Sequence, residues 1–303
     1  MLTTGRPARV AVLCSKRAPG LAHLLDCAER SSAFAVVGVM TTEPDCADID
    51  RVRERGIPVV CRDIHAFYAE RGARLTRDWE VRAAYDAGTI DVVCAFTPDL
   101  VLLDGYLYLL TSSMLEAFPS RLLNLHFSDL MLRDADSRPT YPGIRAVRDA
   151  IVDGQAETCA TVHLVNSEPD GGAPIVRSWG FPVSPLVARA RAWQAMDMLK
   201  AYAYAHQEWM LRDASGPLLE AALNLVTSGR VSLDVLGAQE PQCVTPWRLE
   251  ADGALSLRGL STRDQSAGER PHRVRRRLVC QQPWERRRSA EVPHTPRSQD
   301  GSQ

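Results

Sequence analysis

The feature that most constrains the fold is an alternation of short apolar runs and amphipathic stretches over roughly the first 180 residues. The run at 10–14 is continuously apolar, as in a parallel strand that is covered by helices on both faces. Pro19 then opens a stretch whose leucines recur at helical spacing. Strands separated by helices of this length are typical of right-handed βαβ crossovers. The sequence therefore predicts an α/β fold, a doubly wound and mostly parallel sheet of about seven strands.

The predicted strands are apolar runs that end at turn-forming residues. They are residues 10–14, 33–40, 57–60, 100–103, 122–126, 159–165 and 175–181. The predicted helices between them show apolar residues three and four apart. They lie near residues 20–31, 64–71, 79–87, 113–118 and 144–152.

The pattern changes after residue 185 and divides the chain into three parts. Residues 1–185 are predicted to form the α/β domain, and 186–267 a helical extension with short strands packed on it. Within the extension we expect two helices, at 188–211 and 215–229, and short strands at 231–236 and 247–257. Residues 268–303 are rich in Arg, Pro, Gln and Ser, and are predicted to be a disordered, Arg-rich tail.

Composition narrows the class of protein. The formal net charge of −1 and the absence of an Arg cluster before the tail argue against a nucleic acid as the main partner. The Arg clusters at 273–277 and 285–289 are interpreted as solvated parts of the tail. No apolar stretch is long enough for a membrane span, and the start of the chain lacks a secretion signal. The eight cysteines are scattered, so we expect free thiols, no metal site and a cytoplasmic protein.

Three polar residues follow predicted strands. Asn124 and His126 are two apart at the end of one strand, and therefore point to the same face. Asp170 lies in the loop after a later strand, and we expect all three at the carboxyl edge of the sheet. An amide, an imidazole and a carboxylate in one place can bind an oxyanion and move protons. The alternative is that Asn124 caps a loop, His126 is a buried core histidine and Asp-Gly-Gly is only a turn.

The strings LLNLH, YPGIRAVRDAIVDG and CATVHLVNSEPDGGAPIV resemble the folate-dependent formyltransferase family, and within it most closely the glycinamide ribonucleotide transformylases. The resemblance covers residues 8–185 and implies the family's Rossmann-type fold. It also implies transfer of a formyl group from 10-formyltetrahydrofolate to a primary amine, with glycinamide ribonucleotide of purine biosynthesis as the leading acceptor. No metal is implied. Asn124 would then donate a hydrogen bond to the formyl oxygen. His126, assisted by Asp170, would help transfer a proton between the attacking amine and N10 of the folate.

The resemblance also assigns two binding regions. The residues implied for the folate are Tyr106, Leu107, Tyr108, Leu109, Leu110, Leu122, Val165 and Asn166. The residues implied for the acceptor and its phosphate are Ser15, Lys16, Arg17, Gly20, Arg74 and Gly105, with Arg77 as a further candidate beside Arg74. For the loop at residues 15–20 a solvated basic turn is the alternative.

The chain departs from the family pattern at three places. CSKRAPGL replaces a Gly-Ser-Asn type loop, the segment after His126 is longer, and Tyr108 stands where a basic residue is common. The acceptor is therefore open, and a sugar-nucleotide or natural-product amine is the alternative. Hydrolysis of 10-formyltetrahydrofolate and a non-catalytic binding role also remain, whereas a methionyl-tRNA formyltransferase fits the helical extension poorly. That extension is also suited to pairing with a second copy of the chain in a homodimer.

Overall fold

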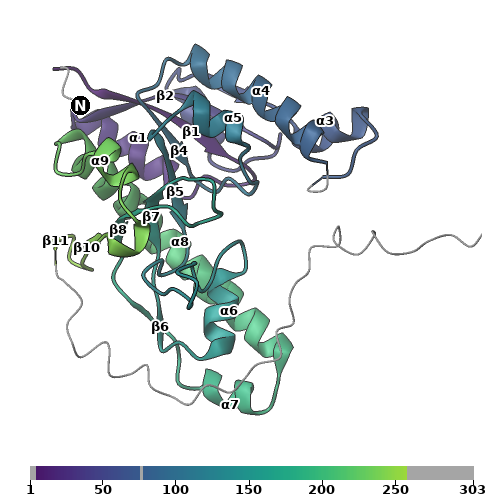
Figure 1. The fold of residues 1–303 in the computed structure, drawn as a ribbon, viewed down its shortest axis with the longest axis vertical. Coiled ribbons are helices and arrows are strands. Elements are labelled where there is room, and N and C mark those ends of the chain that lie inside the picture. The colour runs from purple at the N-terminus through teal and green to yellow at the C-terminus, as the bar shows by residue number, and fades with distance from the viewer. Residues whose placement is uncertain (1–4, 76–77, 258–303) are drawn as a thin grey trace, which may run out of the picture. The chain divides into compact units, whose positions relative to one another are not determined.

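The computed structural model describes residues 5–75 and 78–257, which belong to one compact unit. Its centre is a nine-stranded sheet in the order β11-β10-β8-β7-β5-β4-β1-β2-β3 (Figure 1). Neighbouring strands from β3 to β5 are parallel. β7 runs antiparallel to β5, and β8 antiparallel to β7. β10 is parallel to β8, and β11 closes this edge in the antiparallel direction.

The strands of the large sheet are short, and those at its centre are almost wholly buried. They are β1 (Ala8–Cys14), β2 (Phe34–Thr41), β3 (Val59–Cys61), β4 (Leu100–Leu103), β5 (Leu122–His126), β7 (Thr161–Leu164), β8 (Pro174–Arg177), β10 (Trp247–Leu249) and β11 (Leu255–Ser256). A separate two-stranded sheet pairs β6 (Glu157–Thr158) with β9 (Phe181–Pro182).

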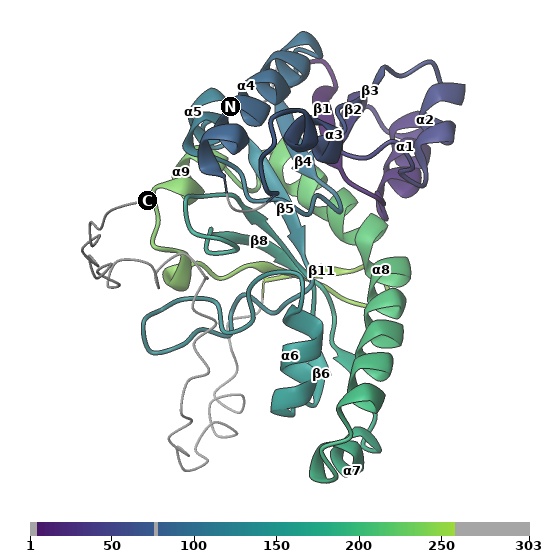
Figure 2. The same cartoon turned by 90° about the vertical axis from the view of Figure 1, so that its right-hand side faces the viewer.

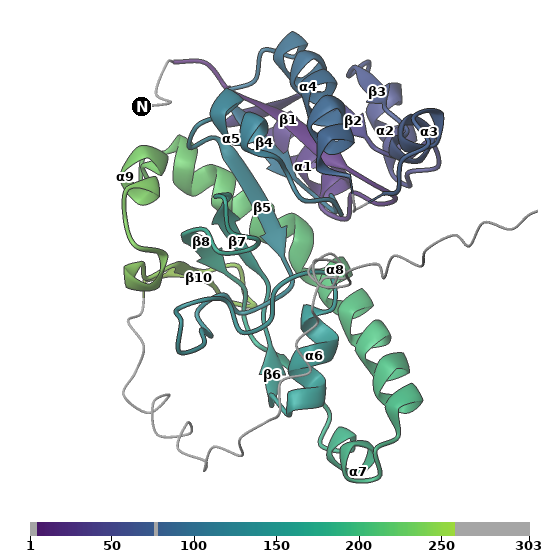
Figure 3. The same cartoon turned by 45° about the vertical axis from the view of Figure 1, so that its right-hand side comes forward.

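The helices lie on both faces of the sheet (Figure 3). They are α1 (Leu21–Arg30), α2 (Ile49–Glu54), α3 (Ile64–Glu70), α4 (Trp79–Ala95), α5 (Ser112–Ala117), α6 (Ala146–Asp153), α7 (Val187–Ala192), α8 (Met196–Thr227) and α9 (Leu233–Gly237), with a 3₁₀ turn at Pro241–Cys243. α1 and α8 bury their apolar residues in the larger core cluster. α4 and α5 pack on the opposite face, in a second cluster.

The expected fold class is confirmed: a mostly parallel sheet with helices on both faces is followed by a helical C-terminal region. The count of about seven strands was low, because the C-terminal region adds β10 and β11 to the edge of the sheet. The expected strand at 175–181 is divided. β8 stays in the large sheet, while β9 leaves it to pair with β6.

The C-terminal helices differ from the prediction. The expected helix at 188–211 is divided between α7 and the first part of α8, and α8 then continues through the expected helix at 215–229 as one helix of 32 residues with Pro217 in its interior. Proline has no N–H and removes one helical hydrogen bond, but residues on both sides of it, such as Met210 and Leu218, are fully buried. Packing therefore keeps the helix continuous. The extension is not separate from the α/β domain. α8 begins next to α7, lies beside α6 and packs on α1 (Figure 2).

The segment VSLDVL forms helix α9 where we expected a strand. Leu233 and Leu236 are three residues apart and both buried, which is the spacing of one helix face. The prediction failed because a run this short fits either period. The expected strands at 247–257 are present as β10 and β11. The predicted tail at 268–303 lies outside the described residues, as does Arg77. Among the described helices, none is long and apolar enough to cross a membrane.

We expect the central strands to carry much of the stability. Leu102 of β4 is fully buried, so Leu102→Ala should lower the free energy of unfolding by about 2–5 kcal/mol. Leu186, whose side chain is 73% exposed, provides the matched control, and Leu186→Ala should change it by less than about 0.5 kcal/mol. Urea unfolding followed by circular dichroism measures both. Equal effects would contradict the placement of β4 at the centre of the sheet.

Candidate active site

The strand β5 presents two polar side chains on one face. Leu123 and Leu125 point into the larger core cluster, so Asn124 and His126 point to the other side of the sheet. Asn124 is half-buried and His126 is buried. β4 pairs with β5 so that Leu103 lies opposite Asn124, which places the loop after β4 beside this face. The shared face that the spacing predicted is therefore present.

Asp170 reaches these residues by a route that we did not expect. β7 runs antiparallel to β5, so its carboxyl end lies beside the start of β5. The loop that follows turns back along the sheet, and the N–H of Leu164 donates to the carbonyl of Ala173 across it. We expected all three residues at the carboxyl ends of parallel strands, and this was wrong for Asp170, because β7 is antiparallel to β5. The folded-back loop nevertheless brings Asp170 to Asn124 and His126.

The two glycines after Asp170 make this reversal possible. A Cβ on Gly172 would lie 1.6 Å from the carbonyl oxygen of Leu164, so only glycine fits. A Cβ on Gly171 would meet the side chain of Glu168. Asp170 itself adopts a left-handed backbone conformation with φ of 54°, which is uncommon outside glycine. Asp-Gly-Gly is therefore a turn, and one that presents a carboxylate.

The Asp170 carboxylate is the centre of the site. Its Oδ1 lies 3.4 Å from Nδ2 of Asn124, 3.5 Å from Nδ1 of His126 and 3.8 Å from Nε2 of His163. Its Oδ2 accepts a hydrogen bond of 2.7 Å from the N–H of Gly143. The side chain is 13% exposed, which leaves a small accessible area on an otherwise enclosed carboxylate. One oxygen is thus fixed by the backbone while the other faces three polar side chains.

His163 is the residue that the sequence analysis missed. It lies on β7 directly opposite Asn124, and its side chain is almost fully buried. Its Nδ1 lies 3.0 Å from the carbonyl oxygen of Leu164 and must be the protonated nitrogen, so Nε2 accepts the 3.0 Å hydrogen bond from Nδ2 of Asn124. Burial lowers the pKa of His163 to about 4, so the ring is neutral near pH 7. The sequence did contain a signal for this residue, because His163 is a polar residue within the apolar strand TVHLV, shortly before the loop that carries Asp170.

His126 and the long segment after it are also connected. Nε2 of His126 lies 3.2 Å from the carbonyl oxygen of Tyr141, and Nδ1 faces Asp170. Each ring nitrogen therefore faces an oxygen, and a protonated ring would donate from both. Because Gly143 holds the second oxygen of Asp170, the segment 127–143 contributes two backbone groups to the site.

The residues predicted to bind folate lie in three places. Tyr106, Leu110, Leu122 and Val165 pack together in the cluster under α4 and α5. Leu107 and Leu109 alternate with them and are 51% and 49% exposed, so this loop presents apolar side chains outward. Tyr106 accepts a hydrogen bond of 2.8 Å from the buried Arg82 of α4, which fixes the loop against that helix.

Of the remaining folate candidates, Tyr108 adjoins that cluster, with its ring edge-on to that of Tyr106 and the centroids 6.0 Å apart. Tyr108 packs against Ile64, Tyr68 and Tyr85, and its hydroxyl donates to Glu43 at 3.3 Å. Asn166 is exposed and caps its own loop by accepting from the N–H of Glu168. Arg74, predicted to contact a phosphate, is exposed.

Four of the residues predicted to bind the acceptor lie between β1 and α1, where other protein groups already bind them: Ser15, Lys16, Arg17 and Gly20. Ser15 is buried and accepts hydrogen bonds from the Thr42 hydroxyl and the Leu107 N–H. Lys16 lies 3.7 Å from Glu43.

The second half of this loop, with the start of α1, is engaged in the same way. Arg17 forms a bidentate pair with Glu208 of α8, at 2.6 and 2.7 Å. Gly20, at the start of α1, donates to the carboxylate of Asp104 at 2.9 Å. The segment after β4 passes close to the loop between β1 and α1 at Gly105. Only glycine fits there, since a Cβ would lie 2.3 Å from the carbonyl oxygen of Arg17.

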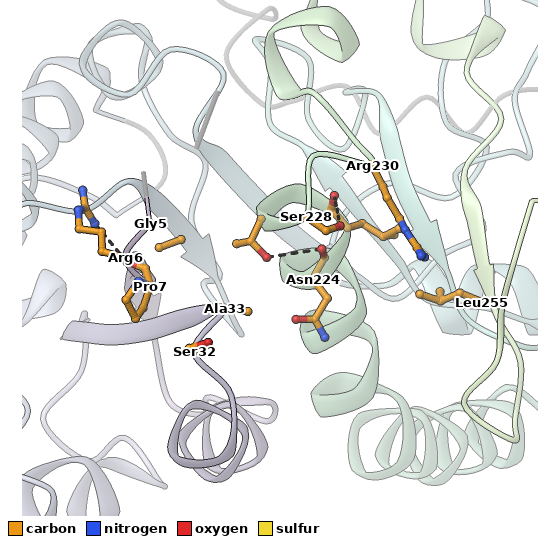
Figure 4. Close-up of a pocket in the computed structure, with 12 residues that line it drawn as sticks. Gly5, Arg6, Pro7, Ser32, Ala33, Asn224, Ser228, Arg230 and Leu255 are labelled. Atoms are coloured by element: carbon orange, nitrogen blue, oxygen red, sulfur yellow. Dashed lines mark hydrogen bonds between the residues drawn. The ribbon is translucent and has the colours of Figure 1, made fainter. Parts of the chain in front are cut away.

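A surface cavity of about 630 Å³ lies away from these residues. It is lined by Gly5–Ala8 and Ala33 at the amino ends of β1 and β2, by the end of α8 at Asn224, and by Ser228 and Arg230 just after that helix (Figure 4). None of the predicted site residues lines it. We therefore base the candidate site on side-chain chemistry and not on this cavity.

One group among the described residues has metal-ligand chemistry: His23 and Cys27 of α1 with Glu220 of α8, whose ligand atoms lie within 4.8 Å of one another. His23 and Glu220 already share a hydrogen bond of 2.7 Å, and the group is separate from Asp170.

Comparison with known proteins now decides the family. Residues 8–186 match the family described as formyl transferase, which is more than half of the chain. The chain belongs to the formyl transferase family.

Named relatives of this formyl transferase agree with that result. A phosphoribosylglycinamide formyltransferase of Mycobacterium tuberculosis is 33% identical over 177 residues, covering 58% of this chain and 72% of that protein. The Escherichia coli protein of the same name is 29% identical over 175 residues, covering 57% of this chain and 73% of that protein. The crystal structure of glycinamide ribonucleotide transformylase 1 from Symbiobacterium toebii is similar with a TM-score of 0.55 and 28% identity, covering 76% of this chain and 92% of that chain.

The lowered pKa of His163 makes a testable link between pH and stability. The unfolded chain takes up a proton near pH 6.5 but the folded chain only near pH 4, so stability should fall as the pH drops between these values. We expect the free energy of unfolding to lose about 2 kcal/mol from this group between about pH 7.5 and pH 5.

Urea unfolding at the two pH values, on wild type and His163→Gln, measures this loss. The variant should be less stable at pH 7.5 and should lack this part of the pH dependence. His65→Gln is the control, since that side chain is 57% exposed. If the free energy of unfolding of His163→Gln changed with pH as much as that of the wild type, the histidine would not be held neutral in the folded protein.

Proposed function

We propose that the protein transfers a formyl group from 10-formyltetrahydrofolate to the primary amine of a small molecule, with Asn124, His126 and Asp170 as the catalytic residues. The observation that carries the proposal is the convergence of Asn124 and His126 on Oδ1 of Asp170. Membership of the formyl transferase family supports the class of reaction. The fold alone would not, since one fold serves many functions.

The first requirement of the reaction is a donor for the charge that develops on the formyl oxygen. The amide of Asn124 is oriented for this by two contacts: one N–H donates to the neutral His163, and the other makes only a long contact of 3.4 Å with Asp170. A formyl oxygen would replace that long contact at little cost. One such donor typically contributes about 3–4 kcal/mol to lowering the barrier.

The second requirement is movement of a proton from the attacking amine to the departing nitrogen. His126 and Asp170 are 3.5 Å apart, and Asp170 faces the same space as the amide of Asn124. The carboxylate would orient and stabilise a protonated His126, whose other nitrogen is held by the carbonyl of Tyr141. Positioned acid–base help of this kind is typically worth about 10²–10⁴-fold in rate.

The chain also offers a surface for the folate. When bound, 10-formyltetrahydrofolate supplies the formyl group. Leu107 and Leu109 are two exposed apolar side chains in the loop after β4, and that strand lies beside Asn124 in the sheet. Exposed leucines next to a polar site fit a ligand that has a flat, largely apolar ring. Tyr106, Leu110, Leu122 and Val165 pack behind them and would fix the loop.

Relatives named for phosphoribosylglycinamide, which is glycinamide ribonucleotide, make that compound the first amine acceptor to test. The deciding experiment follows deformylation of 10-formyltetrahydrofolate by absorbance, without acceptor and with glycinamide ribonucleotide or other amines. Turnover that requires an amine supports transfer. Turnover in buffer alone would instead show hydrolysis, and a protein that neither binds nor deformylates the folate would refute the proposal and leave a binding role.

Replacing the central carboxylate should stop proton transfer while keeping the loop in place. In Asp170→Asn the new carbonyl oxygen can still accept from Gly143, but the charge facing His126 is lost. We expect kcat to fall by roughly 10²–10⁴-fold, with folate affinity changed by less than about threefold. Asp136→Asn, in the exposed part of the long loop, is the control and should retain full activity. Retained turnover in Asp170→Asn would remove Asp170 from the mechanism.

Removing the amide tests the oxyanion role separately. Asn124→Ala takes away the donor and leaves His163 without its partner, so kcat should fall by about 10²–10³-fold. Asn224→Ala, at the distant cavity, controls for loss of an amide in general. Steady-state kinetics and folate titration separate an effect on turnover from one on binding. A change confined to KM would assign Asn124 to binding.

A further inference from the structure

The loop between β1 and α1 is bounded by carboxyl groups of the protein itself. Asp104 follows β4 directly and is fully buried. Its Oδ2 accepts from the N–H of Gly20 at the start of α1, and its Oδ1 has no hydrogen-bond partner among the described residues. The amino end of a helix is where an anion binds most readily, because N–H groups there are free and the helix dipole is positive. At α1 that position is occupied by a carboxyl group of the protein itself, that of Asp104.

The cations of the same loop are also paired. Arg17 donates from both terminal nitrogens to Glu208, and bidentate pairs of this geometry are among the strongest ion pairs. Lys16 is nearest to Glu43, a carboxylate that is 7% exposed. The loop therefore brings two cations against three carboxyl groups, and has no excess positive charge for a phosphate.

Neighbouring contacts hold this arrangement. The N–H of Asp104 donates to the carbonyl of Leu13, and the N–H of Leu107 donates to Ser15. Gly105 passes so close to the carbonyl of Arg17 that no side chain fits there. Burial raises the pKa of Asp104 to about 7, so the group is partly a neutral acid near that pH. A phosphate would have to displace a buried group that is fixed on two sides.

We propose that Asp104 determines acceptor specificity: it fills the amino end of α1 and restricts the enzyme to amines that present uncharged polar groups, such as hydroxyls, and no phosphate ester to this loop. The inference rests on the proposed formyl transfer for its substrate class. β4 lies between β1 and β5, with Leu103 opposite both Leu13 and Asn124, so Asp104 is one residue beyond the strand position next to the catalytic amide. An acceptor whose amine is near Asn124 would therefore extend over this loop.

The test compares two compounds that differ only in the phosphate: glycinamide ribonucleotide and its dephosphorylated riboside. Isothermal titration calorimetry on the full chain gives both dissociation constants without requiring turnover. We expect the ribonucleotide to bind no more tightly than the riboside, and absence of binding by the ribonucleotide agrees with this. Binding of the ribonucleotide tenfold or more tightly than the riboside would overturn the proposal.

A variant makes the role of Asp104 explicit. Asp104→Ala frees the N–H of Gly20 and removes a partly ionised carboxyl group, so affinity for the ribonucleotide relative to the riboside should rise on the order of tenfold. Asp99→Asn removes a charge at the other end of β4 and should leave the ratio as in wild type. An Asp104→Ala protein that is folded by circular dichroism and keeps the wild-type ratio would assign Asp104 a structural role only.

If Asp104→Ala does not fold, the wild-type comparison still decides whether the loop accepts a phosphate. The deformylation assay separates this inference from the proposed function. A chain that neither binds nor deformylates 10-formyltetrahydrofolate refutes formyl transfer, whatever the ratio of the two acceptor affinities.

Discussion

The site depends on one pairing of strands. β7 lies antiparallel to β5 with His163 opposite Asn124, and this register brings a neutral histidine against the amide while sending the following loop back along the sheet. Had β7 continued the parallel order, its carboxyl end would lie beside that of β5 and no reversal would be needed. With the antiparallel order, the loop must turn within a few residues. Gly172 is required because the chain passes directly over the carbonyl of Leu164.

Much of the fold could be predicted because each central strand is a continuous apolar run between turn signals. Leu122–His126 was predicted to the residue, and Leu100–Leu103 likewise. The direction of β7 could not be predicted, because an apolar run of this kind fits either orientation and the pairing is decided by the whole sheet. The continuity of α8 through Pro217 was hidden for a similar reason, since packing on both sides outweighs the local penalty of proline.

The site shows the same division between local and tertiary information. Asn124 and His126 followed from their spacing on one strand, and Asp170 from its Gly-Gly turn. His163 was passed over because a histidine inside an apolar strand is usually part of the core, and here it is both buried and hydrogen-bonded to Asn124. The partners of the loop after β1 could not be found from the sequence, because Glu208 is 191 residues from Arg17 and Asp104 is 84 residues from Gly20 along the chain.

The charges of the two regions are arranged in opposite ways, and this difference has consequences for function. Around Asp170 one carboxylate faces three nitrogen-bearing side chains, of which His163 is held neutral by burial and accepts from the amide of Asn124. In the loop after β1, by contrast, every cation and the amino end of α1 are already matched by a carboxyl group. The first region has one carboxylate shared among several neutral or titratable groups, whereas in the second each cation has its own carboxyl partner. A ligand that contacts both regions can gain little affinity from its charge at the loop after β1, so shape and hydrogen bonding must select it there.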